Sequence, residues 1–419
     1  MRRTLNELPE SLDETYERIL KEIKKPNRDH ARRLLSCLVV AVRPLYVEEL
    51  AEVLAVDFDD AEGIPRLNPN WRWDDEEQAL LTTCSSLISI VKYGASRVVQ
   101  FSHFSVKEFL TSTRLATSIG EVLRYHIALE PAHKIFAEAC LSTLLRSNYR
   151  FKRNGVENSS PLTGYAIRHW TSHAQYSNVS SCLRKAMEYL FDPDKPYFVA
   201  WRRWHDIDTP PHEGSTFYHF APDSKSDAVP LYYAALCGFQ DLVEQLVLKH
   251  PQHVNARGGY YVTPLVAALA GNHFQTAKIL HDNGAHPNVR GYAMATPLHS
   301  AAYYGHLQMV RVLIGCRADV NAWNAVGETP LHYVSECDFV GPNRSRSLHK
   351  VARCLLEHGA DVNARRNDRT TPLHIAAGRG GEEVGNLLLD FGANACVEDI
   401  WGRTPVQMAL QYYSTMEYR

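Results

Sequence analysis

The stretch that decides the fold runs from Thr296 to His306 and reads TPLHSAAYYGH. Its opening Thr-Pro pair recurs along the second half of the chain. Such pairs stand at residues 263–264, 296–297, 329–330, 371–372 and 404–405, and successive pairs are 33, 33, 42 and 33 residues apart. A nearly fixed period of this length is typical of stacked units, none of which can bury its apolar face alone.

Each unit is predicted to be a short pair of helices. Thr296 is a good N-cap, because its hydroxyl can accept a hydrogen bond from the first helical turn. Pro297 fits the first helical position, where no backbone N–H is needed. Gly305 suits the left-handed residue that ends a helix, and Leu307 to Ile314 has the apolar spacing of a second helix. The second half of the chain should therefore form a helical solenoid.

Residues 226–419 resemble ankyrin repeats. The resemblance is carried by TPLH at 296–299, TPLHIAA at 371–377 and LLEHGADVNA at 355–364. It implies five repeats and a C-terminal half-repeat, which is either a cap or a truncated array. It also implies an L-shaped stack whose hairpin tips and first helices line a concave face.

Three departures from the repeat pattern carry structural expectations. The first unit has Val229 in place of the threonine, and the second has Asn272 where the third has Gly305. Asparagine tolerates the left-handed conformation, so Asn272 should still end its helix. The fourth unit is nine residues longer, and we place the insert at Asp338 to Arg346, as a loop between its two helices.

The N-terminal part should combine helices with one β-hairpin. Apolar periodicity predicts helices from residue 12, over 29–42 and 47–55, and from 75, followed by alternating strands over 87–93 and 97–103. Capping boxes at Ser11 and Ser105 should open the first helix and the helix after the hairpin.

This arrangement resembles the winged-helix domain that follows the nucleotide-binding core of NACHT-type signalling NTPases, especially in fungal NACHT–ankyrin (STAND) proteins. The same winged helix is also named after GPI inositol-deacylase-like proteins. The carrying stretches are LPESLDETYERIL at 8–20, RPL at 43–45 with EEL at 48–50, and FSHFSVKEFL at 101–110.

The resemblance implies a nucleotide-sensing role for one histidine. In NACHT proteins the histidine of the Phe-x-His-x-Ser motif can contact a nucleotide phosphate, and the matching residue is His103. The alternative is an ordinary histidine at a strand end, bonded to a neighbouring backbone group. The chain has no Gly-x-x-x-x-Gly-Lys-Ser/Thr loop, so we expect no cofactor unless a NACHT core is supplied.

We therefore expect a mainly α protein in three parts. Residues 1–120 form a winged-helix domain with a small β-hairpin wing, 121–225 a helical connector, and 226–419 the ankyrin solenoid. Within the connector, helices are predicted over 132–145, around 165–170 and over 179–190, and residues 192–228 are predicted to be irregular.

Composition points to an intracellular protein. The 419 residues carry a net charge of −2, and the nine cysteines include no Cys-x-x-Cys pair, which is typical of reduced thiols. No apolar run reaches the ~20 residues that span a bilayer. We expect a cytoplasmic or nuclear protein that does not bind membranes. Nucleic acid is not an expected partner either, because the candidate recognition helix carries Glu48, Glu49 and Glu52, which would repel phosphates.

Enzyme chemistry is not expected from this chain. It contains no Gly-x-Ser-x-Gly elbow and no His-Glu-x-x-His pair. His299, His332 and His374 recur at one position of the repeat. The ankyrin resemblance implies that this histidine braces the adjoining hairpin, so we do not expect a metal site.

The resemblance implies that variable positions of the array face a protein ligand on the concave surface. Register with Thr296 selects aromatic and arginine residues, which are enriched in interface hot spots. The candidates are Tyr260, Tyr261, Tyr292, Ala295, Tyr303, Tyr304, Trp323, Arg366, Arg369 and Trp401. The alternative is that some of them pack between hairpins.

Two functions remain open at this point. The first is a protein–protein interaction module in which the array binds a protein ligand and the winged helix regulates. The second is the C-terminal fragment of a NACHT/STAND NTPase switch, of the innate-immunity or heterokaryon-incompatibility kind. An in-frame phosphate-binding loop upstream of Met1 would favour the second, and neither fixes the oligomeric state.

Overall fold

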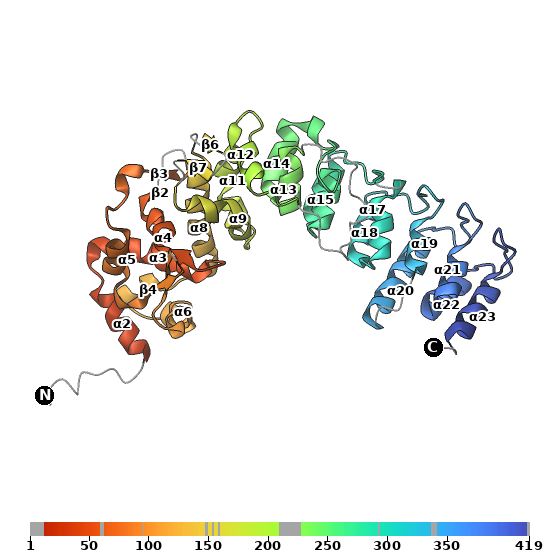
Figure 1. The fold of residues 1–419 in the computed structure, drawn as a ribbon, viewed down its shortest axis with the longest axis horizontal. Helices are drawn as coiled ribbons and strands as arrows, with labels where there is room; N and C mark the ends of the chain where they lie inside the picture. The colour runs from red at the N-terminus through yellow and green to blue at the C-terminus, as the bar shows by residue number, and fades with distance from the viewer. Residues whose placement is uncertain are drawn as a thin grey trace. The chain divides into compact units, whose positions relative to one another are not determined.

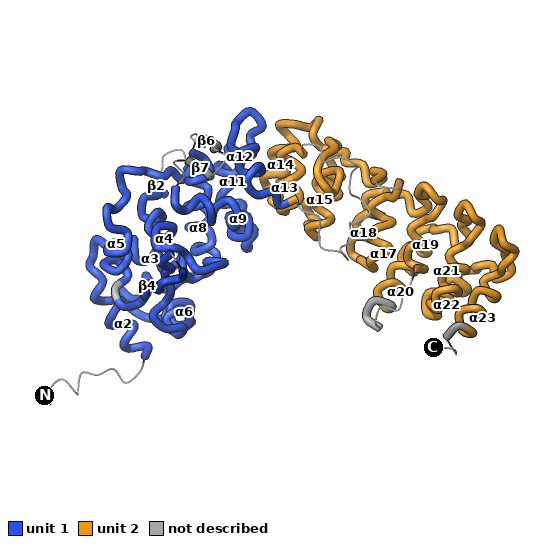
Figure 2. The backbone as a smooth tube through the Cα atoms, viewed as in Figure 1, with its two compact units in different colours: residues 1–207 blue, residues 208–419 orange. Residues whose placement is uncertain are grey.

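A computed structural model describes residues 12–58, 63–94, 96–146, 150–152, 155–157, 160–208, 228–291, 294–336 and 342–416. The chain divides into two compact units, residues 1–207 and residues 208–419 (Figure 2). Helices predominate in both units, so the mainly α fold class is confirmed (Figure 1). The predicted boundary at residue 120 lies inside the first unit, and the three-part division stays a prediction.

The first unit consists of helices with short strands interspersed among them along the chain. The helices are α2 (Leu12–Glu22), α3 (Arg28–Val40), α4 (Val47–Glu52), α5 (Glu76–Cys84), α6 (Phe104–Leu110), α7 (Thr113–Ala116), α8 (Leu129–Leu144), α9 (Thr163–Ala174), α10 (Val179–Cys182), α11 (Arg184–Leu190) and α12 (Pro196–Trp204). The strands are β1 (Leu45–Tyr46), β2 (Val56–Asp57), β3 (Arg66–Leu67), β4 (Ile88–Tyr93), β5 (Ser96–Phe101), β6 (Arg150–Lys152) and β7 (Gly155–Glu157).

The predicted hairpin forms a three-stranded sheet with one strand that the sequence analysis missed. Strands β4 and β5 pair antiparallel, with Ile88 opposite Phe101, and β1 pairs with the other edge of β5. Strand β1 has only two residues, so it is too short to show the alternation of apolar and polar residues that predicts a strand. The core of the unit lies where α3 packs against α5 and α8, with Leu34 and Phe136 fully buried.

Two N-terminal details differ from the sequence expectations. Helix α6 begins at Phe104 with His103 as its N-cap, whereas the capping box was expected at Ser105. His103 has an extended backbone, and its imidazole takes the place of the hydroxyl that usually caps a helix. The other predicted cap, Ser11, lies outside the described residues.

The connector contains more regular structure than expected. Helix α12 occupies part of the stretch that was predicted to be irregular, and Pro196 stands in its first turn. The buried indole of Trp201 donates a hydrogen bond to the carbonyl of Ile167 at 3.0 Å, which anchors α12 to α9. This long-range contact favours a helix where the local proline-rich sequence indicated none.

The second unit is a stack of helix pairs. First and second helices alternate as α13 (Pro230–Cys237), α14 (Gln240–Lys249), α15 (Pro264–Ala270), α16 (Phe274–Asp282), α17 (Pro297–Tyr303), α18 (Leu307–Gly315), α19 (Pro330–Ser335), α20 (Pro342–Glu357), α21 (Pro372–Arg379), α22 (Glu382–Asp390) and α23 (Pro405–Met416). Each first helix begins at the proline that the repeat pattern identified.

The core of the stack runs between two layers of helices. Second helices pack in sequence, α14 on α16, α16 on α18, α18 on α20 and α20 on α22. Among the first helices, α13 packs on α15, and α17, α19, α21 and α23 pack in sequence. One leucine, two residues after the cap, points into this core in five successive repeats and is at most 5% exposed. These residues are Leu231, Leu265, Leu298, Leu331 and Leu373.

The ends of the repeat helices largely follow prediction. Gly305 and Asn272 both adopt the left-handed conformation, with φ of 72° and 60°. The insert of the fourth repeat differs from the expected loop, because residues 342–346 form the first turns of α20, and residues 337–341 lie outside the described part. Helix α23, in the C-terminal half-repeat, ends at Met416.

Candidate partner-binding surface

In the third, fourth and fifth repeats, one histidine fixes the hairpin that follows it. In the third repeat, Nδ1 of His299 accepts a hydrogen bond from the backbone N–H of Thr296 at 3.1 Å. Its Nε2 lies 2.9 Å from the carbonyl oxygen of Glu328, in the hairpin before the next repeat. His332 and His374 make the same pair of contacts one and two repeats later. The expected bracing role of this histidine is confirmed.

These contacts require a neutral imidazole. A carbonyl oxygen can only accept a hydrogen bond, so Nε2 of His299 carries the ring proton. Nδ1 is unprotonated and accepts the bond from Thr296. Burial lowers the pKa of His299 and that of His332 to about 4. The hairpins are therefore held by rigid, uncharged side chains within the array.

Two tryptophans are exposed at the hairpin tips. Trp323 is 55% exposed and Trp401 is 61% exposed. The guanidinium of Arg290 lies 4.7 Å from the ring centroid of Trp323, and that of Arg403 lies 4.7 Å from the ring centroid of Trp401. A cation over an aromatic face holds the indole in place while leaving much of it accessible. Both residues lie where the sequence analysis expected partner contact.

Three further exposed apolar residues accompany the tryptophans. They are Met294, Val326 and Ile400. The repeat register could have identified Val326 and Ile400 as hairpin residues. Val326 and Trp401 both stand three residues before a cap threonine, and Ile400 directly precedes Trp401. We call Met294, Trp323, Val326, Ile400 and Trp401 the hairpin-tip row.

The two candidate arginines have different surroundings. Arg366 is partly buried, with Nη1 3.0 Å from Oε1 of Glu328 and Nε 2.8 Å from Oδ1 of Asp368. It therefore ties two neighbouring hairpins together. Arg369 is exposed at a hairpin turn, with φ of 60°.

The tyrosine pair of the third repeat is half-buried. The rings of Tyr303 and Tyr304 lie 4.9 Å apart, nearly perpendicular, and the Tyr303 ring also lies 6.1 Å from that of Tyr333 in the next repeat. Both tyrosines contribute to packing and keep part of their surface accessible.

Three other candidates lie inside the array. Tyr260, Tyr261 and Ala295 are buried. The backbone N–H of Tyr260 donates to the carboxylate of Asp208 at 2.6 Å, and that of Tyr261 donates to the hydroxyl of Tyr232 at 3.0 Å. This hairpin therefore folds inward over buried polar groups. Tyr292 lies outside the described residues.

The nucleotide-sensing candidate has a structural role in this unit. Nδ1 of His103 accepts from the backbone N–H of Ser105 at 3.3 Å and lies 2.6 Å from its hydroxyl. The hydroxyl in turn lies 2.7 Å from that of Tyr16. These contacts match the alternative interpretation, a histidine bonded to neighbouring backbone at a strand end.

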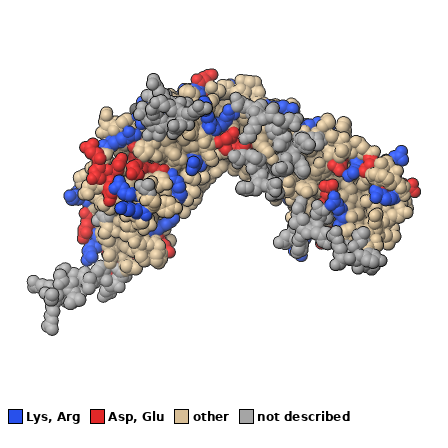
Figure 3. All heavy atoms as spheres, viewed as in Figure 1, with Lys and Arg blue, Asp and Glu red and all other residues tan. Residues whose placement is uncertain are grey.

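Charges of both signs are interspersed on the face shown in Figure 3. On α4, the carboxylates of Glu49 and Glu52 are buried and paired with Arg43 and Arg72. These two acids therefore stabilise the fold rather than form a charged surface.

In the described ranges, no three His, Cys, Asp or Glu residues come together as metal ligands, and no helix has the length and apolarity to cross a bilayer.

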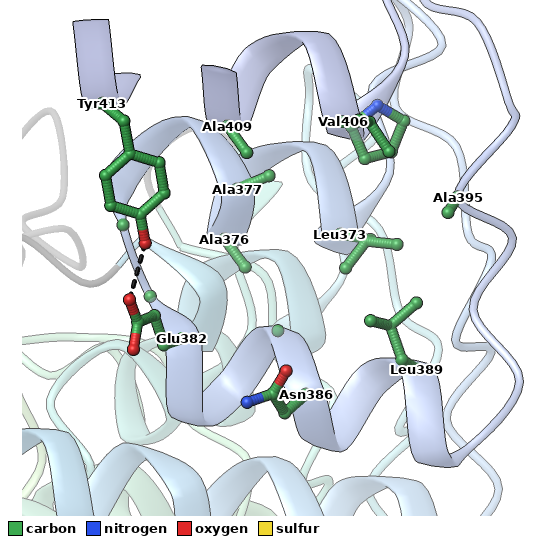
Figure 4. A pocket seen from close by; sticks show the side chains of 14 residues that line it. Leu373, Ala376, Ala377, Glu382, Asn386, Leu389, Ala395, Val406, Ala409 and Tyr413 are labelled. Carbon is green, nitrogen blue, oxygen red and sulfur yellow. Dashed lines mark hydrogen bonds between the residues drawn. The ribbon is translucent and has the colours of Figure 1, made fainter. Parts of the chain in front are cut away.

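A groove of about 210 Å³ opens at the C-terminal end of the array, between α21, α22 and α23 (Figure 4). Its walls are mainly apolar and include Leu373, Leu389, Val406 and Ala409. At the rim, the hydroxyl of Tyr413 donates to Oε1 of Glu382 at 2.6 Å.

Comparisons with known families place two kinds of domain on the chain. Residues 16–120 match the family described as the winged helix domain of GPI inositol-deacylase. Residues 266–366 and 355–409 match two ankyrin-repeat families. The winged helix and the ankyrin repeats are thereby both supported.

Individual relatives are similar to parts of the chain. The azaphilone pigments biosynthesis cluster protein L of Monascus ruber is 30% identical over 298 residues, or 67% of this chain and 60% of that protein. The ankyrin repeat and SOCS box protein 16 of Homo sapiens is 45% identical over 71 residues, 17% of this chain and 16% of its own length. Rabankyrin-5 of Mus musculus is 43% identical over 68 residues, 13% of this chain and 6% of its own.

Proposed function

For a chain that carries a winged-helix domain and ankyrin repeats, we propose a role as a non-enzymatic interaction protein whose array binds a protein ligand. The winged helix is proposed to be its regulatory element. The observation that carries the proposal is the hairpin-tip row, in which five apolar side chains are exposed. All of them except Met294 lie on hairpins that His299 or His374 braces.

The chemistry of the row fits a protein surface. Exposed apolar residues grouped on one structural feature mark interaction sites, and tryptophan is among the strongest hot-spot residues. Because the hairpins of the two tryptophans are already held by His299 and His374, little conformational entropy is lost there when a ligand binds.

Basic residues beside the row indicate the charge of the ligand. Arg290 and Arg403 stack on the two tryptophans, and Arg369 is exposed at a hairpin turn between them in sequence. A ligand with apolar side chains flanked by carboxylates would complement this arrangement. The proposed surface includes the accessible edges of Tyr303 and Tyr304 and leaves out the buried Tyr260, Tyr261 and Ala295.

The test uses the full chain as bait in a lysate of the cells that produce it. Wild-type protein is compared with the double variant Trp323→Ala, Trp401→Ala, and captured proteins are quantified by mass spectrometry. Leu248→Ala is the matched control, because Leu248 is an exposed apolar residue on α14, away from the row. The ligand should be lost from the double variant and kept by the control.

Thermal unfolding distinguishes lost binding from lost folding. Both tryptophans are largely exposed, so the double variant should melt within a few degrees of wild type. Equal capture by wild type and double variant would contradict the proposed surface. Replacing Tyr303 and Tyr304 is a less direct test, because Tyr303 also packs against Tyr333.

A further inference from the structure

Helix α23 carries no charge and exposes several apolar side chains. Pro405 to Met416 contains no charged residue. Val406, Leu410 and Tyr413 are 55%, 65% and 48% exposed. Their spacing of four and three residues places all three on one face of the helix. We call these three residues the α23 stripe.

The stripe includes a repeat position that is buried in the other repeats. Val406 occupies the register position of the five core leucines, each at most 5% exposed. On α22, Leu389 is exposed, while Leu356, 33 residues earlier on α20, is buried. The apolar positions of a regular repeat are thus present here, but within the described residues no helix covers them.

The groove continues an interface that is already established in the array. Helix α20 packs on α18 and α19, and α22 packs on α20. The next step of this layer is the groove bounded by α21, α22 and α23 (Figure 4). Its expected occupant is therefore a helix with apolar residues spaced like those of the stripe.

The stripe itself meets this requirement. We propose that two copies of the chain associate about a twofold axis, with the α23 stripe of each copy lying in the α21–α22–α23 groove of the other. A twofold interface is self-complementary, so one surface must offer both the groove and the side chains that fill it. Val406 and Tyr413 line the groove, and Leu410 projects beside it.

The energetics favour this pairing over exposure to water. The stripe exposes apolar side chains to water in the single chain, and removing apolar surface from water is favourable. Since α23 has no charge, burying it desolvates no ion. The nearby carboxylate of Glu382 already accepts a hydrogen bond from Tyr413 and can stay hydrated at the rim.

Sedimentation velocity of the full chain over a wide concentration range tests the proposal. Wild-type protein should reach twice its chain mass of 47.4 kDa. Leu410→Lys should stay at the chain mass, because two ammonium groups would be buried in the interface. Leu248→Lys, at an exposed leucine on α14, is the control and should still dimerise.

Several outcomes would overturn the proposal. One is a wild-type protein that keeps the chain mass at every concentration, and another is a Leu410→Lys variant that still doubles its mass. A mass that grows beyond the dimer would also overturn it, because a twofold interface closes. Far-ultraviolet circular dichroism spectra should be the same for all three proteins, which excludes misfolding as the cause.

The outcome is independent of the proposed ligand surface. The hairpin-tip row lies on the hairpins and the stripe on α23. Leu410→Lys should therefore keep ligand capture, and the double tryptophan variant should keep the dimer.

Discussion

The buried histidines His299, His332 and His374 set the geometry of the array at the scale of single residues. Each links the cap of its own helix to the hairpin of the next repeat through two hydrogen bonds. The neutral ring must accept at Nδ1 and donate at Nε2. A charged ring could not accept, so protonation and bracing exclude each other.

Replacing one of these histidines should destabilise the array. In His332→Ala the backbone N–H of Thr329 and the carbonyl of Thr370 lose their buried partner. We expect a loss of about 2 to 4 kcal/mol, since each unsatisfied buried group costs about 1 to 3 kcal/mol. Urea unfolding measures this loss of unfolding free energy. As the control, His286→Ala replaces an exposed histidine and should change the free energy of unfolding by less than about 0.5 kcal/mol. Equal stability of the two variants would contradict the bracing role.

His299 and His332 should make stability depend on pH. Their folded pKa of about 4 lies below the unfolded value of 6.5, so the unfolded chain binds more protons between these values. The stabilisation is fully present above pH 6.5 and is lost as pH falls toward 4. Each histidine accounts for on the order of 3 kcal/mol over this range.

Urea unfolding at a series of pH values measures this dependence. The double variant His299→Gln, His332→Gln should have lower stability at neutral pH and a shallower decline below pH 6.5 than wild type. Parallel profiles would show that these two residues do not cause the decline.

Residue positions were predictable where local chemistry decides them. The cap threonines and the bracing histidines follow from a repeated local pattern. The burial of Tyr260 and Tyr261 does not, because it depends on Asp208 and Tyr232, which precede them by many residues and meet them only in the fold. The sequence marked both tyrosines as surface residues for lack of that contact.

At the scale of elements, residues with a left-handed backbone end the repeat helices. Asn272 ends α15 with a φ of 60°, where most repeats have glycine. Asn272→Gly should keep or slightly raise stability, because glycine adopts this conformation without strain. Asn272→Ala should cost about 1 kcal/mol, because its Cβ clashes in the left-handed region. Equal unfolding free energies for the two variants would contradict this assignment.

The elements that sequence reasoning missed have causes that are not local. Strand β1 exists because β5 offers it an edge, and α12 is held by the bond from Trp201 to Ile167. The start of α6 was misplaced because histidine is an uncommon N-cap. In contrast, the repeat helices carry their start and stop signals in their own sequence.

At the scale of the whole molecule, the chain has two compact units. The first unit contains the winged helix, and the second presents the hairpin-tip row and the α23 stripe. The repeat architecture was predictable because its period is visible in the sequence. The exposed row was only partly predictable, since exposure depends on how each hairpin folds over its neighbour.

The central claim is that the array recognises a protein ligand through the hairpin-tip row. The most direct measurement is titration calorimetry of the captured, purified ligand against wild-type chain and the Trp323→Ala, Trp401→Ala variant. The variant should bind at least about tenfold more weakly, equivalent to about 1.4 kcal/mol, because two aromatic anchors are lost. Equal affinity for both proteins would contradict the claim.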